Sequence, residues 1–219
     1  MSDKKSNYKV ESQYFPHKFL WKVCNMMFEE GNKNNIKDEK EKFYMTSLLM
    51  AFLSYEGYIN YLGENIAPEI WEDEQNFFTR QNNYPGIKGK LKFLLEKIGE
   101  EMPDEEEVQY STILKLKKFR DTLSHIKPYK CEISANDDID EKLFYFQTNL
   151  QQYIEQFCTK DNTECVIINV ENFIECLHKK AKNYINSKNG CHIKVNGWFH
   201  GYALKGFNSI NVGRTTSED

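Results

Sequence analysis

Arg120 and His125 lie five residues apart in the segment LKKFRDTLSHIKP, residues 116–128. An arginine presents a rigid fork of N–H donors that matches phosphate oxygens, and an imidazole can accept or release a proton near neutral pH. Together the two side chains could act on a phosphodiester. With only three Arg and five His in the chain, such a match arises by chance on the order of once in five similar chains. The alternative is an ordinary basic helix whose histidine complements the helix dipole.

The end of this helix decides whether the two side chains can meet. Residues five apart on an ideal helix point about 140° away from each other. Pro128 disfavours the helical conformation at Lys127, so we expect the helix to end near His125. A backbone that leaves the helix there would let the imidazole turn toward Arg120.

Basic residues are concentrated around this pair, although the whole chain has a net charge of −4. The segment 113–130 contains one acid, Asp121, and six cationic residues: Lys115, Lys117, Lys118, Arg120, Lys127 and Lys130. A phosphate backbone would bind along such a basic strip. The alternative is a helix surface that simply faces water.

An earlier helix, predicted over residues 42–66, carries polar residues on an otherwise apolar face. Glu56 and Asn60 lie one helical turn apart, beside Phe52 and Ile59. A carboxylate in such a place is costly to bury unless a cation pairs with it. We therefore expect Glu56 or Asn60 to contact Arg120, and the alternative is a structural polar pair within the helical bundle.

The two segments together resemble a known family. A long helix reading FLSYEGYINYLG, followed by a later helix that ends in FRDTLSHIKP, is similar to the HEPN domain (higher eukaryotes and prokaryotes nucleotide-binding). Active members of that family carry R-x(4–6)-H, often with a polar residue directly after the Arg; here these are Arg120, Asp121 and His125. The resemblance covers about residues 40 to 130. Some family toxins place a Tyr two residues after the His, where this chain has Lys127.

The resemblance implies a metal-independent endoribonuclease of bacterial toxin or anti-phage defence type, with no cofactor. The RNA 2′-OH would attack the adjacent phosphorus, with His125 moving a proton and Arg120 stabilising the charge on the phosphate. Glu56, Asn60 and Asp121 would support the site. Five lysines would bind the RNA: Lys115, Lys117, Lys118, Lys127 and Lys130.

The resemblance also implies partners. HEPN ribonucleases dimerise so that two Arg–His pairs face one cleft, so we expect a homodimer, together with an antitoxin or regulatory protein. One alternative is a catalytically silent HEPN-like module for binding or dimerisation. Another is a substrate-binding helical protein that has no tie to RNA.

The elements that must position these residues are predicted to be mostly helices. The expected architecture is all-α: an antiparallel helical bundle with extra helices over residues 1–190. Besides 42–66, the periodicity predicts helices over about 15–30 (ended by Gly31), 69–82, 87–99, 105–125, 141–158 and 169–187. Residues 191–219 form a Gly-rich and aromatic tail, whose pattern is closer to a β-hairpin than to a helix.

Several classes of protein and site are disfavoured by the sequence. The start MSDKKSNYKV lacks the apolar run of a signal peptide, and no run of eighteen apolar residues suggests a membrane span. Six scattered cysteines without a C-x-x-C pair suit free thiols in a reducing cytosol. Cys191, His192 and His200 lack a metal-ligand pattern. The sequence therefore predicts a cytoplasmic protein that binds neither a membrane nor a metal.

Overall fold

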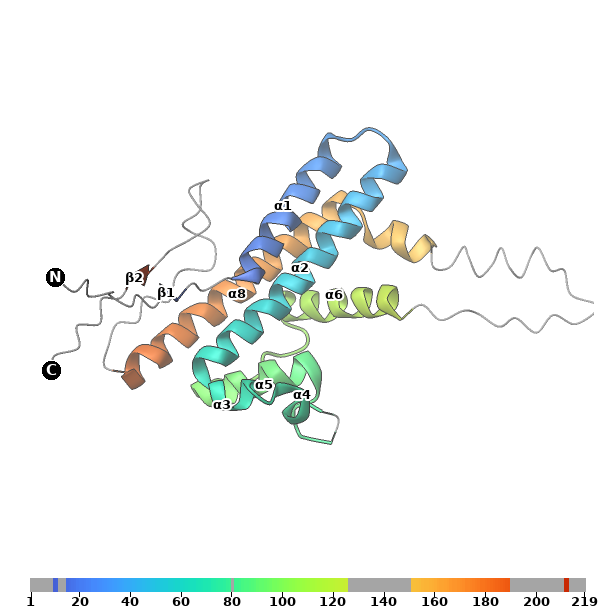
Figure 1. The fold of residues 1–219 in the computed structure, drawn as a ribbon. Coiled ribbons are helices and arrows are strands. Elements are labelled where there is room, and N and C mark those ends of the chain that lie inside the picture. Colours follow the sequence, from blue (N-terminus) through green and yellow to red (C-terminus); the bar gives the residue numbers. More distant parts are fainter. Residues whose placement is uncertain (1–9, 12–14, 80, 126–150, 190–210, 213–219) are drawn as a thin grey trace, which may run out of the picture.

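The computed structural model describes residues 10–11, 15–79, 81–125, 151–189 and 211–212. Within them the chain is mostly helical, which agrees with the predicted all-α class (Figure 1). The helices are α1 (Pro16–Lys33), α2 (Lys37–Ile66), α3 (Pro68–Trp71), α4 (Glu74–Phe77), α5 (Gly86–Ile98), α6 (Val108–Ser124) and α8 (Lys160–Asn189). Residues 151–157 are also helical. The strands β1 (Val10–Glu11) and β2 (Asn211–Val212) pair antiparallel.

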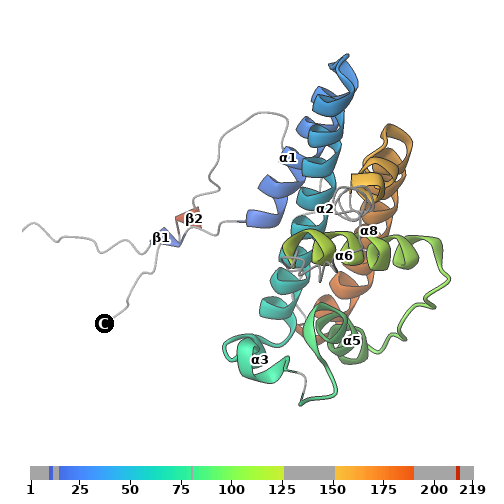
Figure 2. The same cartoon turned by 90° about the vertical axis from the view of Figure 1, so that its right-hand side faces the viewer.

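Three long helices form the body of the fold. α1 runs antiparallel to α2, and α8 runs alongside them in the same general direction as α2 (Figures 1 and 2). α5 and the short helices α3 and α4 gather near the C-terminal end of α2 (Figure 1). The tail predicted over 191–219 lies outside the described residues except for β2.

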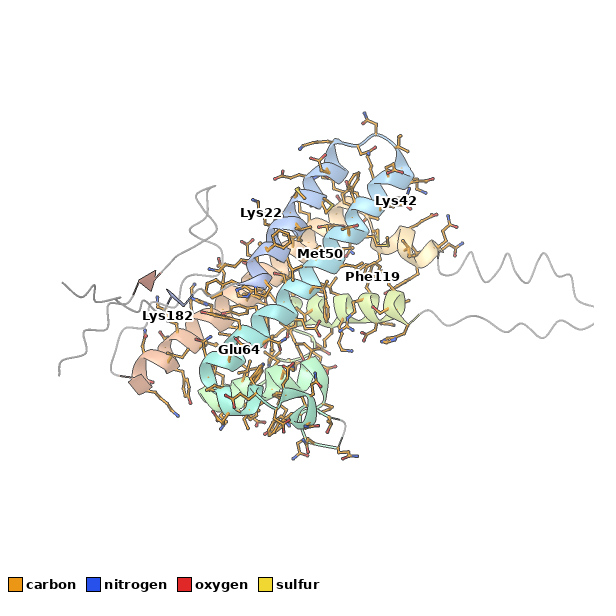
Figure 3. The ribbon with its side chains drawn as sticks, in the orientation of Figure 1. Lys22, Lys42, Met50, Glu64, Phe119 and Lys182 are labelled. Carbon is orange, nitrogen blue, oxygen red and sulfur yellow. The ribbon has the colours of Figure 1, made fainter. Side chains whose placement is uncertain are left out.

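α6 packs against both α2 and α8. Its direction differs from the prediction, because α6 lies across α2 and not antiparallel along it (Figures 1 and 2). The reason is that α6 packs its apolar side chains against two helices at once, and Leu116 and Phe119 have no exposed surface. Phe119 is labelled in Figure 3. Its ring also stacks on that of Phe157, in the helical residues 151–157.

Some helix boundaries also differ from the prediction. Gly31 does not end α1 but lies inside it and is buried, because the ring of Tyr44 on α2 approaches it so closely that a Cβ there would lie 2.6 Å from that ring. The single helix expected over 69–82 is divided into α3 and α4. α8 begins at Lys160, nine residues before the predicted start at 169.

A buried polar cluster joins α1, α2 and α8. The ring of His17 packs edge-on against Tyr58, and the Tyr58 hydroxyl lies 2.8 Å from Nδ1 of His178. Burial lowers the pKa of His17 to about 3, with a smaller contribution from Lys18. Burial also lowers the pKa of His178, as do the nearby Lys182 and Lys18. In the folded protein both environments therefore favour the neutral imidazole.

This cluster predicts that acid destabilises the fold. Above a pH of about 6.5 the histidines are neutral in both states, but below it the unfolded chain takes up protons that the folded chain does not. For His17, whose folded-state pKa is about 3, the free energy of unfolding should fall by up to about 1.4 kcal/mol per pH unit between about pH 6.5 and pH 5. His178 should add to the decline in the same direction, because its pKa is also lowered. Urea unfolding across this range measures the decline. A His178→Asn variant should show a shallower decline, and an equally steep one would contradict this account.

Candidate functional site

Arg120 lies in the last turns of α6, and its side chain points toward α2. Its Nη2 is 3.5 Å from Oε1 of Glu56, and the guanidinium carbon lies 4.6 Å from the centre of the Phe52 ring. The side chain of Arg120 is 23% exposed, so the group is fixed in place but still reaches solvent. Its Nε is buried and has no hydrogen-bond partner among the described residues. The neighbours therefore orient the guanidinium without satisfying all its donors.

Asp121, the polar residue after the Arg, adds a second carboxylate. Its Oδ1 lies 3.0 Å from Nη1 of Arg120, and its Oδ2 lies 2.5 Å from Nζ of Lys117 one turn earlier. The two cations are thus matched by the two carboxylates of Glu56 and Asp121. A phosphate that reaches Arg120 would have to compete with at least one of them.

His125 follows the last residue of α6 as its C-cap. Its backbone N–H donates to the carbonyl of Asp121, and its dihedral angles (φ −121°, ψ 31°) are no longer helical. The helix therefore ends where Pro128 led us to expect. The side chain of His125 is exposed, so its imidazole is accessible to a substrate.

Asn60 contacts a lysine of α5 and makes no hydrogen bond to Arg120. Nζ of Lys90 donates to Oδ1 of Asn60 over 2.9 Å and to Oε2 of Glu74 over 2.6 Å. Of the two residues expected to contact Arg120, Glu56 is the one that the fold brings to it. Asn60 instead holds a second cation, one turn further along α2.

The predicted basic strip is only partly described. Lys115 and Lys118 are exposed on α6, whereas Lys117 is half-buried and paired with Asp121. Lys127 and Lys130 lie outside the described residues. The two exposed lysines are available for contact with an anion, and the charge of Lys117 is already compensated within the protein.

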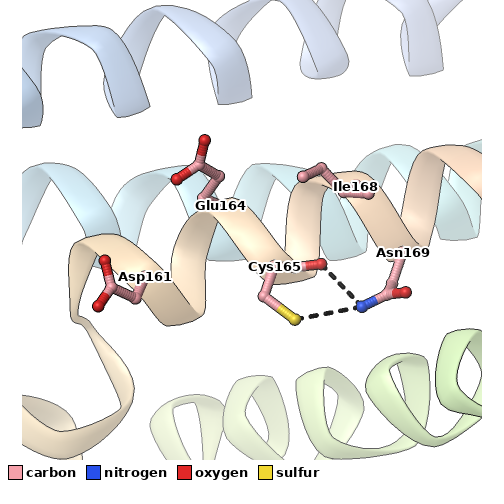
Figure 4. A pocket seen from close by; sticks show the side chains of 5 residues that line it. All are labelled: Asp161, Glu164, Cys165, Ile168 and Asn169. Carbon is pink, nitrogen blue, oxygen red and sulfur yellow. Dashed lines mark hydrogen bonds between the residues drawn. The ribbon is translucent and has the colours of Figure 1, made fainter.

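A shallow pocket of about 390 Å³ lies elsewhere, on α8 (Figure 4). It is lined by Asp161, Glu164, Cys165, Ile168 and Asn169, and the Asn169 amide donates to the Cys165 carbonyl and sulfur. The lining contains two carboxylates and no cation, so it does not favour a phosphate ligand.

Three further features concern the predicted thiols, metal ligands and membrane spans. In the part of the chain that the structure describes, Cys24, Cys158, Cys165 and Cys176 are free thiols. The described residues contain no cluster of three His, Cys, Asp or Glu side chains that could hold a metal ion. No helix of the described ranges is long and apolar enough to cross a membrane.

Two contacts of the site were missed by sequence reasoning. Phe52 was expected only as an apolar neighbour, but its ring supports the guanidinium of Arg120. Lys90 was not singled out, although it lies on the buried side of α5 between the positions of Ile87 and Leu94. A lysine within an apolar helical face signals a buried anion or amide partner.

The chain matches no family model, no curated protein and no solved structure. The resemblance to the HEPN domain therefore stays a prediction that depends on the residues quoted above.

Proposed function

We propose that the protein is a metal-independent endoribonuclease of toxin or anti-phage defence type that uses Arg120 and His125. The observation that carries the proposal is the end of α6, where an exposed imidazole follows a guanidinium that Glu56 and Phe52 hold in place. An oriented Arg and an accessible His are the two groups needed for phosphodiester transesterification. The neighbouring Lys115 and Lys118 add exposed positive charge for the RNA backbone.

The proposed reaction begins at the RNA 2′-hydroxyl. A base removes its proton, the oxygen attacks the adjacent phosphorus, and the bond from phosphorus to the 5′-oxygen breaks. The leaving oxygen takes up a proton, which gives a 2′,3′-cyclic phosphate and a 5′-hydroxyl. His125 transfers a proton at one of these two oxygens. Arg120 donates to the non-bridging oxygens, where negative charge increases in the transition state.

One histidine does not easily serve both the attacking and the leaving oxygen. In the proposed protein two chains associate, so that two Arg–His pairs face one cleft, as in the HEPN ribonucleases that the sequence resembles. In a symmetric dimer the two copies of the pair would lie near the two-fold axis. An antitoxin or regulatory protein would cover this cleft.

A catalytically silent HEPN-like module is the second candidate. It is favoured by one observation: the charges of Arg120 and Lys117 are balanced by those of Glu56 and Asp121. An ion-pair network of this kind can also serve only to join α6 to α2. The silent module would still dimerise or bind a partner, but it would leave RNA intact.

One experiment distinguishes the ribonuclease from the silent module. Purified protein should cut single-stranded RNA in EDTA and spare DNA of the same sequence, because DNA lacks the attacking hydroxyl. Gel electrophoresis of end-labelled strands measures both rates. Intact RNA at high protein concentration, from protein that forms dimers, would favour the silent module.

A further inference from the structure

The polar row of α2 lies between cations from two different helices. Glu56 pairs with Arg120 of α6, and Asn60, one turn later, accepts a hydrogen bond from Lys90 of α5. Residues four apart on a helix are surface neighbours, with Cβ atoms about 5–6 Å apart. Arg120 and Lys90 are therefore held along one strip of α2, each by its own polar partner.

Lys90 is unusually well fixed for a lysine. Its side chain is 14% exposed, and its Nζ lies 5.5 Å from the centre of the Phe78 ring. An ammonium has three donors, and the two described hydrogen bonds go to Asn60 and Glu74. The third donor has no hydrogen-bond partner within the described ranges. Since the side chain is already ordered, binding an anion would cost little further rotamer entropy.

The partners of Lys90 allow a phosphate to replace the carboxylate that compensates its charge. Asn60 is neutral, so it positions the ammonium without compensating the charge. The compensating carboxylate, Glu74, is 35% exposed and belongs to the four-residue helix α4. When a phosphate replaces a carboxylate as the partner of a cation, a solvent-exposed carboxylate loses less free energy than a fully buried one.

We propose that Lys90 binds the RNA phosphate next to the one at Arg120, on the same strand. The inference rests on the proposed function, since it extends the same site along α2. Lys90 is a positioning residue, because it acts on a phosphate that does not react. Asn60 and Phe78 hold it in place, and Glu74 is the group that the phosphate displaces.

The test measures RNA binding as a function of salt, with a short single-stranded RNA that is 2′-O-methylated and so lacks the attacking hydroxyl. Each phosphate neutralised on a single strand adds about 0.7 to the slope of log affinity against log salt. Lys90→Gln should lower that slope by about 0.7 and weaken binding by about threefold to tenfold. Lys90→Arg should retain the slope. Fluorescence anisotropy at several KCl concentrations gives both quantities.

Lys97→Gln is the matched control. Lys97 lies on the same helix, and its Nζ also lies over an aromatic ring, that of Phe93, but it is exposed and contacts neither Glu56 nor Asn60. Its removal should leave the slope unchanged. Cleavage of unmodified RNA gives a second readout: Lys90→Gln should raise KM and leave kcat unchanged, as expected for a contact that ground and transition states share.

The outcomes separate this inference from the proposed function. If the wild-type protein cuts RNA but Lys90→Gln keeps the full slope and KM, Lys90 is a structural partner of Glu74 and the inference is wrong. The same holds if Lys97→Gln lowers the slope equally. If the wild-type protein binds RNA with the predicted dependence on Lys90 but cuts none, the inference holds and the catalytic proposal fails. If it binds no RNA, both fail.

Discussion

Replacement of His125 by Ala is expected to lower the rate of RNA cleavage by roughly 10²–10⁴-fold, the range for loss of a positioned acid–base group. The exposed side chain of His125 makes no hydrogen bond or ion pair to another described residue, so the substitution should leave the fold intact. Thermal unfolding should confirm an unchanged Tm, and single-turnover kinetics measure the rate. Ser124→Ala, an exposed neighbour, is the matched control and should cleave like the wild type. Equal rates for His125→Ala and wild type would remove the imidazole from the mechanism.

Replacement of Arg120 by Ala should reduce cleavage at least as much, for two reasons. It removes the donors to the non-bridging oxygens, and it leaves the half-buried Glu56 without the cation that compensates it. Arg120→Lys separates these reasons. Lysine keeps the charge beside Glu56 but loses the fork of donors, so this variant should keep most of the stability and still lose most of the activity. An Arg120→Lys protein with wild-type activity would contradict the proposed role.

Replacement of Phe119 by Ala is expected to lower the free energy of unfolding by about 3–5 kcal/mol, the usual cost of a large cavity in a core. Phe119 has no exposed surface, and its ring lies 4.4 Å from the ring of Phe157 in a stacked arrangement. The contact joins α6 to the helical residues 151–157, so its loss also loosens the helix that carries Arg120 and His125. Urea unfolding at constant pH measures the change.

Val108→Ala is the control on the same helix. Val108 is 65% exposed at the start of α6, so its truncation should change the free energy of unfolding by no more than about 0.5 kcal/mol. A loss below about 1 kcal/mol for Phe119→Ala would mean that α6 does not depend on this contact.

The helices and part of the site follow from local patterns in the sequence. Apolar periodicity predicted α2, α5 and α6 within a few residues, and Pro128 predicted the end of α6 near His125. The polar intrusion of Glu56 on an apolar face predicted its pairing with a cation, because an unpaired buried carboxylate is too costly. The sequence alone was therefore enough to name Arg120 and His125 as the candidate pair and Glu56 as a candidate carboxylate partner of Arg120.

Other features depend on contacts between distant segments, which periodicity does not contain. Gly31 predicted a helix end, but α1 continues to Lys33, and the ring of Tyr44 on the next helix leaves no room for a Cβ at position 31. The sequence left open whether Glu56 or Asn60 contacts Arg120. Glu56 does, whereas Asn60 binds Lys90, which reaches α2 from a helix thirty residues later. The direction of α6 across α2 follows from burial against α8 as well, and no single segment reveals such a three-helix contact.

The most direct test of the catalytic account is the chemistry of the RNA ends. One defined single-stranded RNA is incubated in EDTA with the wild-type protein or with His125→Ala, and the products are identified by mass spectrometry. The account predicts fragments with a 2′,3′-cyclic phosphate and fragments with a 5′-hydroxyl from the wild type, and a roughly 10²–10⁴-fold slower appearance of both from the variant. Products with 5′-phosphate and 3′-hydroxyl ends, or the same cyclic products at equal rates from both proteins, would contradict it.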